Sequence, residues 1–340
     1  MKRVLFCGSL LPVFGSLPER TSRSTHASAL TIWLAASLSV CSSGCIDKMM
    51  VDTELKMTRR ASGALDTVGD YEVGRAAAAA SIAQLEGMHM LAPRNPNGLF
   101  MLTKVWAGLG YAFIEDDLEA AEDRGDDKST KYLRQRARMA YDRAVFFALQ
   151  LLGQKAEGFE QVRKSGPAIT KWLADNFESK DDAVNLFWTS YPWLARINLM
   201  KGDDDEGPPL IAELYVGVAM LERAVAIDPA VEHDLGMLAL AAYHARTNLA
   251  EMEQAKTIFD TVLAKTGGTA LVVQLTYATR YACVKGDGAL YQDLLGRVLR
   301  AEDPDPQRRL ENAIARRRAE RWLGKGRARE ECGIDVASSD

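Results

Sequence analysis

The sequence contains little of the chemistry on which enzymes and metal sites depend. Of its 340 residues, four are histidine and five are cysteine. Beyond residue 44 the histidines are His89, His233 and His244, and none lies in a His-Glu-x-x-His pair or near a cysteine at metal-ligand spacing. A Gly-x-Ser-x-Gly nucleophile elbow, a Gly-x-x-x-x-Gly-Lys phosphate loop and a strand followed by Gly-x-Gly-x-x-Gly are also absent. We therefore predict that the protein is not an enzyme and holds neither a metal nor a cofactor.

Long apolar runs, excess positive charge and strand signals are equally scarce. No run of about 20 apolar residues follows residue 44, so the body of the chain is not predicted to cross a membrane. Residues 45–340 carry 38 basic and 45 acidic residues, a net charge of −7 that disfavours nucleic acid as a partner. Alternating Val/Ile/Thr runs and Asn-Gly hairpin turns are almost missing, which predicts an all-α protein.

The one notable apolar run, residues 29–40, is too short to span a membrane and has the length of a signal-peptide core. A basic flank precedes it, and small residues lead from it to Cys45; these are Arg20, Arg23 and His26, then Ser42, Ser43 and Gly44. We predict a signal peptide over residues 1–44, whose start resembles an N-terminal extension, and lipidation of Cys45 as in a bacterial lipoprotein.

Two alternatives stay open at this end of the chain. The first is an ordinary signal peptide with an incidental cysteine, and the second is lipidation of Cys41, a weaker acceptor because bulky Val40 precedes it. Ile46, in the second mature position, is not the Asp that retains lipoproteins in the inner membrane of enterobacteria. We therefore expect a lipid anchor that faces the periplasm, in the outer membrane rather than the inner.

Two cysteines remain in the body of the chain, Cys283 and Cys332. They could pair in an oxidising compartment, but a separation of 49 residues says nothing about their distance in space. We expect two buried thiols.

Apolar residues at helical spacing, interrupted by Gly, Pro and Asp, predict a series of helices. The predicted ranges are 71–91, 98–121, 129–152, 167–177, 181–200, 209–227, 232–247, 250–265, 269–285, 288–302 and 306–324. We predict a lipidated N-terminus and linker over 45–70, a helical domain over 71–324 and a polar tail over 325–340.

A repeat of small, large apolar and small residues, spaced four and then three apart, recurs in these helices and is typical of tetratricopeptide repeats. The matches are Ala137, Tyr141 and Ala144; Gly217, Leu221 and Ala224; Ala255, Phe259 and Val262; and, more loosely, Ser81, Leu85 and Met88, and Gln292, Gly296 and Leu299. We predict a tetratricopeptide-like solenoid of helical hairpins in which residues 154–203 form an inserted helical pair. The alternative is an unrelated helical bundle with coincidental spacing.

The most unusual composition is an aromatic segment at residues 187–199. We predict that Trp188, Tyr191, Trp193 and Asn198 form a ligand or partner surface, because aromatic walls with a few polar groups build such sites. Pro192 would kink a helix there or free a backbone carbonyl. The alternative is that the rings only fill the junction between the insert and the repeats.

Three other polar or glycine-rich segments receive structural interpretations. Glu115, Asp116 and Asp117 are interpreted as a polar helix end, and residues 203–206 as a solvated acidic turn. The glycines of Gly108-Leu109-Gly110 are expected to let two helices pack closely. The arginine-rich segment 308–323 is interpreted as a solvated capping face, with a surface for an acidic partner as the alternative.

Three phrases, set between a lipoprotein signal and degenerate helical repeats, resemble the T component of tripartite ATP-independent periplasmic (TRAP) transporters. They run from Phe187 to Asp203, from Leu221 to Pro229 and from Asn312 to Leu323. The resemblance covers nearly all of the mature chain. It implies a periplasmic lipoprotein of tetratricopeptide-like helices that docks the transporter's solute-binding subunit, forms oligomers and provides a ligand passage. Pro192 stands where a small residue is expected in the family.

The first hypothesis is therefore a non-enzymatic accessory protein of solute uptake, with a TRAP-type periplasmic solute-binding protein as its partner and a homo-oligomer as its assembly. The second is a generic tetratricopeptide-like scaffold lipoprotein for envelope protein assembly. The sequence identifies neither the solute nor the oligomeric state.

Overall fold

The computed structural model describes residues 48–200, 207–246 and 251–336. The chain divides into two units, Met1–Met49 and Met50–Asp340, and the contacts below belong to the second. Every regular element of the described residues is a helix and none is a strand, which confirms the all-α class. The predicted signal peptide, Cys45 and the acidic turn at 203–206 lie outside the described residues.

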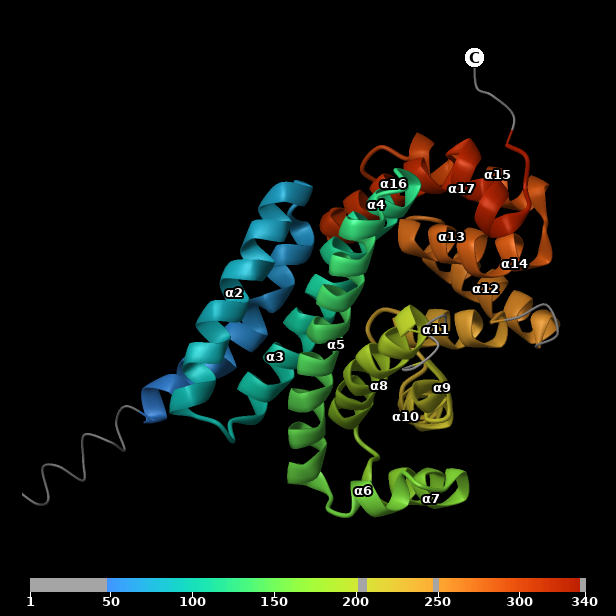
Figure 1. Ribbon diagram of the computed structural model, residues 1–340. Helices are drawn as coiled ribbons and strands as arrows, with labels where there is room; N and C mark the ends of the chain where they lie inside the picture. The colour runs from blue at the N-terminus through green and yellow to red at the C-terminus, as the bar shows by residue number, and fades with distance from the viewer. Residues whose placement is uncertain (1–47, 201–206, 247–250, 337–340) are drawn as a thin grey trace, which may run out of the picture. The chain divides into compact units, whose positions relative to one another are not determined.

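Figure 1 shows the order of the helices along the chain. Residues 48–61 are helical. They are followed by η1 (Ser62–Thr67), α2 (Tyr71–Leu91), α3 (Pro96–Leu109), η2 (Gly110–Ile114), α4 (Glu115–Asp123), α5 (Asp127–Lys155), α6 (Phe159–Val162), α7 (Gly166–Asn176), α8 (Lys180–Met200), α9 (Gly207–Ile211), α10 (Leu214–Ile227), α11 (Leu235–His244), α12 (Met252–Thr266), α13 (Leu271–Tyr277), η3 (Ala278–Ala282), α14 (Cys283–Lys285), α15 (Gly288–Arg300), α16 (Arg309–Trp322) and α17 (Lys325–Cys332).

Local capping explains why several predicted boundaries agree with the structure. The Asp70 carboxylate accepts hydrogen bonds from the amides of Glu72 and Val73, at 2.9 and 3.0 Å, and starts α2 at the predicted residue. Asn95 caps α3 through the amide of Gly98 at 2.9 Å, with a proline in the first turn, so α3 begins at Pro96, two residues before the predicted start. Such signals are local, so the sequence alone reveals them.

The predicted helix over 98–121 is a continuous run of α3, η2 and α4 that contains a π-helical turn, Gly110–Ile114. The expectation of close packing holds at Gly110, where an added Cβ would lie 2.8 Å from the ring of Tyr141 on α5. It is wrong at Gly108, because an added Cβ there would meet no atom within 4 Å. Gly108 therefore borders open space.

The predicted helix start at residue 232 is wrong because the chain makes a left-handed turn there. Glu232, His233 and Asp234 have φ angles of 48°, 55° and 73°, and α11 begins only at Leu235. Non-glycine residues adopt this conformation rarely, so the surrounding structure must hold it. Lys104 on α3 pairs with Glu232 at 3.3 Å, and Lys265 on α12 pairs with Asp234 at 2.5 Å.

Two segments expected to be irregular contain helix. Within the predicted linker, residues 48–61 are helical and Leu55 is fully buried, in contact with the backbone of Gly98. Within the predicted polar tail, α17 buries Ala328 and Arg327. Each segment supplies a buried side chain to the core. The sequence did not reveal this contribution because most residues of both segments are polar.

Helices close in sequence pack against one another in turn: α2 on α3, α3 on α5, α5 on α8, α8 on α10, α10 on α11 and α11 on α12 (Figure 1). Side chains of the three clear repeat matches are buried, as in Tyr141, Leu221 and Phe259. The loosest match is not in the core, because Leu299 is 37% exposed. The solenoid and the inserted pair stay predictions. No helix of the described residues combines the length and the apolar character needed to cross a membrane.

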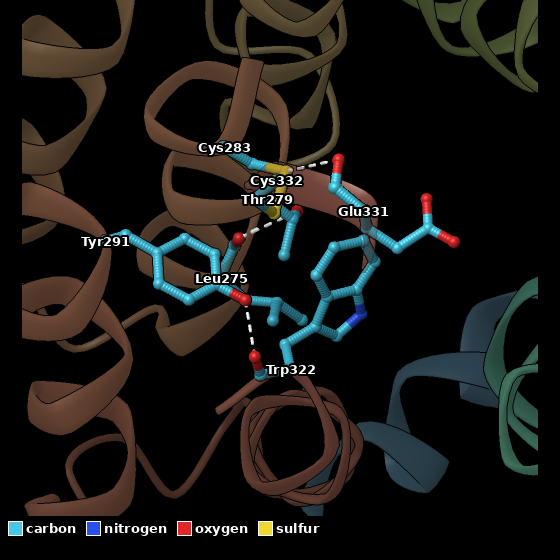
Figure 2. Close-up of a disulfide and its surroundings, with 7 residues drawn as sticks. All are labelled: Leu275, Thr279, Cys283, Tyr291, Trp322, Glu331 and Cys332. Carbon is cyan, nitrogen blue, oxygen red and sulfur yellow. Dashed lines mark hydrogen bonds between the residues drawn. A yellow bond between two sulfur atoms is a disulfide. The ribbon is translucent and has the colours of Figure 1, made fainter. Parts of the chain in front are cut away.

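The expectation of two buried thiols is wrong. Cys283 on α14 and Cys332 at the end of α17 form a disulfide (Figure 2). Beside it, the Tyr291 hydroxyl donates a hydrogen bond to the carbonyl of Trp322 at the end of α16. The long sequence separation concealed the pairing because helices α15 and α16 fold back between the two cysteines.

We predict that removing this disulfide lowers the free energy of unfolding. Replacing both cysteines by alanine frees a loop of 49 residues, for which the chain-entropy relation gives about 4 kcal/mol. Urea unfolding of the double variant should show a lower midpoint than the wild type. Wild type in dithiothreitol is the control and should approach the double variant, whereas coincident midpoints under oxidising conditions would contradict the prediction.

Candidate functional site

One face of the run α3–η2–α4 carries Lys104, Gly108, Tyr111 and Glu115, at spacings of four, three and four residues. Residues at these spacings lie on one side of a helix. The π-helical turn of η2 holds Tyr111, and π turns occur frequently at functional sites. Gly108 borders open space and lies on this face between Lys104 and Tyr111.

Helix α8 supplies the facing wall. The Tyr191 ring lies 6.0 Å from the ring of Tyr111, and also 6.0 Å from that of Trp188, both edge to face. The Lys104 ammonium lies 5.0 Å from the Trp188 ring, within reach of a cation–π interaction. We call Lys104, Tyr111, Glu115, Trp188 and Tyr191 the aromatic site.

Among the described residues, no hydrogen bond joins the phenol oxygen of Tyr111 or Tyr191 to another residue. On the same helix, Asn185 Oδ1 and Trp188 Nε1 are buried without a partner among the described residues. Because unpaired buried polar atoms are costly, a water or a ligand atom is expected beside them.

The polar end of the aromatic site centres on Glu115. Its carboxylate accepts a hydrogen bond from the Tyr141 hydroxyl at 2.5 Å and lies 3.7 Å from the guanidinium of Arg318. Burial raises the pKa of Glu115, although the charge of Arg318 and the bond from Tyr141 act in the opposite direction. Burial also raises the pKa of Tyr111 and of Tyr191, so both phenols stay neutral.

Two of the four predicted surface residues lie together and two lie apart. Trp188 and Tyr191 line the aromatic site. Trp193 points to the opposite side of α8, where it is 3% exposed and its indole N–H donates to the Glu213 carbonyl at 3.2 Å. Asn198 is exposed to solvent. The predicted set therefore does not share one face, and the role of each member stays a prediction.

Pro192 leaves α8 a single α-helix, Lys180–Met200. Proline cannot donate the hydrogen bond that the carbonyl four residues earlier would otherwise receive. That carbonyl belongs to Trp188, so it is released from the helix at the aromatic site itself.

The residues that the sequence analysis missed lie on the α3–η2–α4 face: Lys104, Tyr111 and Glu115. Their four-three-four spacing with Gly108 was a usable signal for a shared face. What the sequence did not reveal is that this face turns towards Trp188 and Tyr191 on α8.

The interpretation of Glu115, Asp116 and Asp117 as a polar helix end is wrong for Asp116, which is 0% exposed. The nearby Glu119 is also buried, at 8% exposed. The interpretation of segment 308–323 as a solvated capping face is wrong for Arg318, which is 5% exposed, whereas Arg309 and Arg317 are exposed. Arg327, beyond this segment, is 7% exposed. The acids of α4 and the arginines of α16 and α17 pair with each other instead.

We call this set the α4–α16 ion-pair network. Asp116 accepts from Arg317 at 2.6 Å and from Arg321 at 2.8 Å, and Glu119 accepts from Arg318 and from Arg321. Asp123 accepts from Arg327 at 2.7 Å. The acidic partner of the arginines is thus part of the same chain.

The pKa values show which effect dominates in this network. Burial alone would raise the pKa of Asp116 and of Glu119. The arginines outweigh burial: hydrogen bonds from Arg321 and Arg317 lower the pKa of Asp116, and the charge of Arg318 lowers that of Glu119. Both carboxylates are therefore held in the ionised form.

The three histidines beyond residue 44 lie on different elements. His89 packs edge to face on Phe147 at 5.0 Å, and burial lowers its pKa. His233 is exposed in the left-handed turn, and His244 ends α11. Across the described ranges, no group of three or more His, Cys, Asp or Glu side chains could hold a metal ion.

Two surface hollows lie away from the aromatic site. One of about 560 Å³ is lined by Arg94 and residues 153–157, and one of about 370 Å³ by Leu263, Gly267, Gly268, Gln274 and Arg297. Neither hollow is lined by a residue that we predicted as part of a ligand or partner surface.

Comparison with known protein families gives a match to this chain. Residues 68–328 match the protein family described as TRAP transporter T-component. A search among curated proteins found no match.

We predict that acid weakens the fold through the α4–α16 ion-pair network. Folding lowers the pKa of Asp116 and Glu119, so their ionised forms stabilise the protein above the unfolded-state pKa, about 4. This stabilisation is lost as the pH falls through the lower folded-state values. The free energy of unfolding, measured by urea titration between pH 6 and pH 3, should decrease with acid.

Glu119→Gln should flatten that decrease, because a neutral side chain no longer takes up the proton. The exposed Glu330→Gln is the matched control and should keep the full decrease. Identical pH profiles for Glu119→Gln and wild type would contradict the assignment.

Proposed function

This chain belongs to the TRAP transporter T-component family, and we propose that it is an envelope lipoprotein that docks the solute-binding subunit of its transporter and passes ligand through the aromatic site. Family membership is the observation that carries the proposal. It makes the protein an accessory component of a transporter, and we propose that it catalyses no reaction. It also indicates a location in the bacterial envelope or periplasm.

The proposed membrane anchor is a lipid on Cys45. The Cys283–Cys332 disulfide supports an oxidising compartment, since such bonds persist outside the cytoplasm and are rare within it. No helix of the described residues could span a membrane, so attachment would come from the acylated N-terminus. Ile46 favours the outer membrane as the site of that attachment.

The ligand role rests on the geometry of the aromatic site. Trp188 and Tyr191 offer apolar rings, Gly108 on the facing run of helices borders open space, and the phenol hydroxyls of Tyr111 and Tyr191 have no hydrogen-bond partner among the described residues. Arg318 adds positive charge beside Glu115. Apolar walls with a few fixed polar groups suit an apolar ligand or a carboxylic acid with an apolar body.

The docking role rests on the arrangement of the helices. Neighbouring helices pack in sequence order, which supports tetratricopeptide-like hairpins stacked on each other, with the 154–203 pair inserted among them. Stacked hairpins present continuous surfaces suited to binding a folded partner. A homo-oligomer would bring several such surfaces together.

Co-purification tests the docking role. We expect the protein, released from the envelope in mild detergent, to retain the TRAP solute-binding subunit encoded beside its gene. Retention of outer-membrane assembly proteins, without the solute-binding subunit, would contradict the proposal and favour the scaffold alternative.

We predict that filling the open space at Gly108 blocks the ligand. In Gly108→Leu the new side chain would occupy that space, so the affinity for cis-parinaric acid, a fluorescent long-chain carboxylic acid, should fall at least about tenfold. Fluorescence titration measures the affinity. Gly153→Leu is the matched control, because an added Cβ also meets no atom within 4 Å there and the residue lies at the far end of α5. Equal affinity of wild type and Gly108→Leu, or no binding by the wild type, would contradict the ligand role.

A further inference from the structure

The first helical segment and the end of α2 expose large apolar side chains. Met50 and Met57, seven residues apart on the helix over 48–61, are 64% and 58% exposed. Met90 and Leu91, in the last turn of α2, are 83% and 69% exposed. We call these four residues the N-terminal apolar patch. Exposed apolar side chains gathered in this way mark an interaction surface.

The four residues lie at one end of the α2–α3 hairpin. Asp52 accepts a hydrogen bond from Asn95 at 2.6 Å, and Arg59 donates to Asn97 at 3.3 Å, so the first helix lies along the start of α3. Leu55, Met88 and Ala92 share one buried cluster beneath the patch.

The outer face of α2 continues the patch without charge. Its exposed residues from Val73 onwards are all apolar, small or amide: Val73, Ala76, Ala79, Ala80, Ala83, Gln84, Gly87, Met90 and Leu91. Basic side chains border the patch at Lys56, Arg60 and Arg94, together with the acid Glu54. Apolar side chains flanked by basic ones are typical of surfaces that rest on anionic lipid headgroups.

The short segment between Cys45 and Met50 indicates what covers the N-terminal apolar patch. Met50 follows Cys45 by only five positions, with four residues between them. A fully extended chain spans at most about 3.6 Å per residue, so Met50 stays within roughly 18 Å of an anchored Cys45. The headgroup layer of a bilayer is itself about 5–8 Å thick on each side. An anchor at Cys45 therefore keeps Met50, the first residue of the patch, within reach of the membrane surface.

We propose that the N-terminal apolar patch is a bilayer-docking surface that inserts Met50, Met57, Met90 and Leu91 among the lipid headgroups. The patch then fixes how the protein stands on the membrane and turns the remaining helices towards its soluble partners. This inference rests on the lipid anchor of the proposed function and adds an orientation to it.

Depth-dependent quenching tests the orientation. Single variants Met57→Cys and Met90→Cys of the acylated mature protein are labelled with an environment-sensitive nitrobenzoxadiazole dye. The native cysteines do not compete, because Cys283 and Cys332 are joined and Cys45 carries the lipid. The control is Leu299→Cys on α15, a partly exposed apolar position outside the patch.

On vesicles of phosphatidylcholine and phosphatidylglycerol with doxyl-labelled lipid, dyes at 57 and 90 should emit at shorter wavelength. They should also be quenched at least twofold more than the dye at 299. Similar, solvent-like emission from all three positions would overturn the proposal. Quenching at 57 that survives the double change Met90→Glu and Leu91→Glu would also overturn it.

A second arm separates failure of the docking surface from failure of the anchor. Residues 46–340 with hexahistidine in place of Cys45 are tethered to nickel-chelating lipid and carry the same dyes. Quenching at 57 and 90 in this arm supports the docking surface even if intact mass shows no acyl group on native Cys45. A blue shift in solution without vesicles, together with a doubled or tripled mass, would show that a second copy covers the patch and would overturn the proposal.

Discussion

The α4–α16 ion-pair network is the interaction on which the rest of the structure depends. Its carboxylates and guanidinium groups come from residues about 200 positions apart, and several are almost fully buried. Burying a charge costs several kcal/mol unless a partner compensates it. The acids of α4 are therefore tolerated inside the fold only when α16 and α17 are in place. This requirement makes the C-terminal helices a part of the same structural unit as α3 and α4.

The network also shapes the aromatic site. Arg318 pairs with Glu119 in the network, approaches Glu115 at 3.7 Å, and places its guanidinium 4.7 Å from the ring of Tyr111. Positive charge thus reaches the end of the site that carries the two phenol hydroxyls. A ligand with an acidic or polar group would meet Arg318 there, and its apolar part would meet Trp188. In the proposed transporter component, the same residue would link ligand contact to the packing of the C-terminal helices.

The sequence predicted features that depend on neighbouring residues. It did not predict features that depend on contacts between distant parts of the chain. The bounds of α2 depend on Asp70 and on Pro93, both adjacent to the helix, and were predicted. The left-handed turn at Glu232–Asp234 depends on Lys104 and Lys265 from other helices, so no local signal gave it. The π turn at Tyr111 and the pairing of Cys283 with Cys332 also depend on tertiary packing. For the candidate site, the aromatic composition pointed to Trp188 and Tyr191. The side of α8 on which Trp193 lies, and the facing residues Tyr111 and Glu115, required the fold.

Arg318 on α16 and Glu119 on α4 stabilise one another across the chain. A double-mutant cycle with Arg318→Met, Glu119→Gln and both together measures this coupling directly from the free energies of unfolding. Each single variant removes one side of the Arg318–Glu119 pair, while Arg321 still pairs with Glu119 and Glu115 still lies near Arg318; the double variant removes both sides. We expect a coupling free energy of about 2–3 kcal/mol, with the double variant less destabilised than the sum of the single variants. Additive effects, with a coupling near zero, would contradict the account.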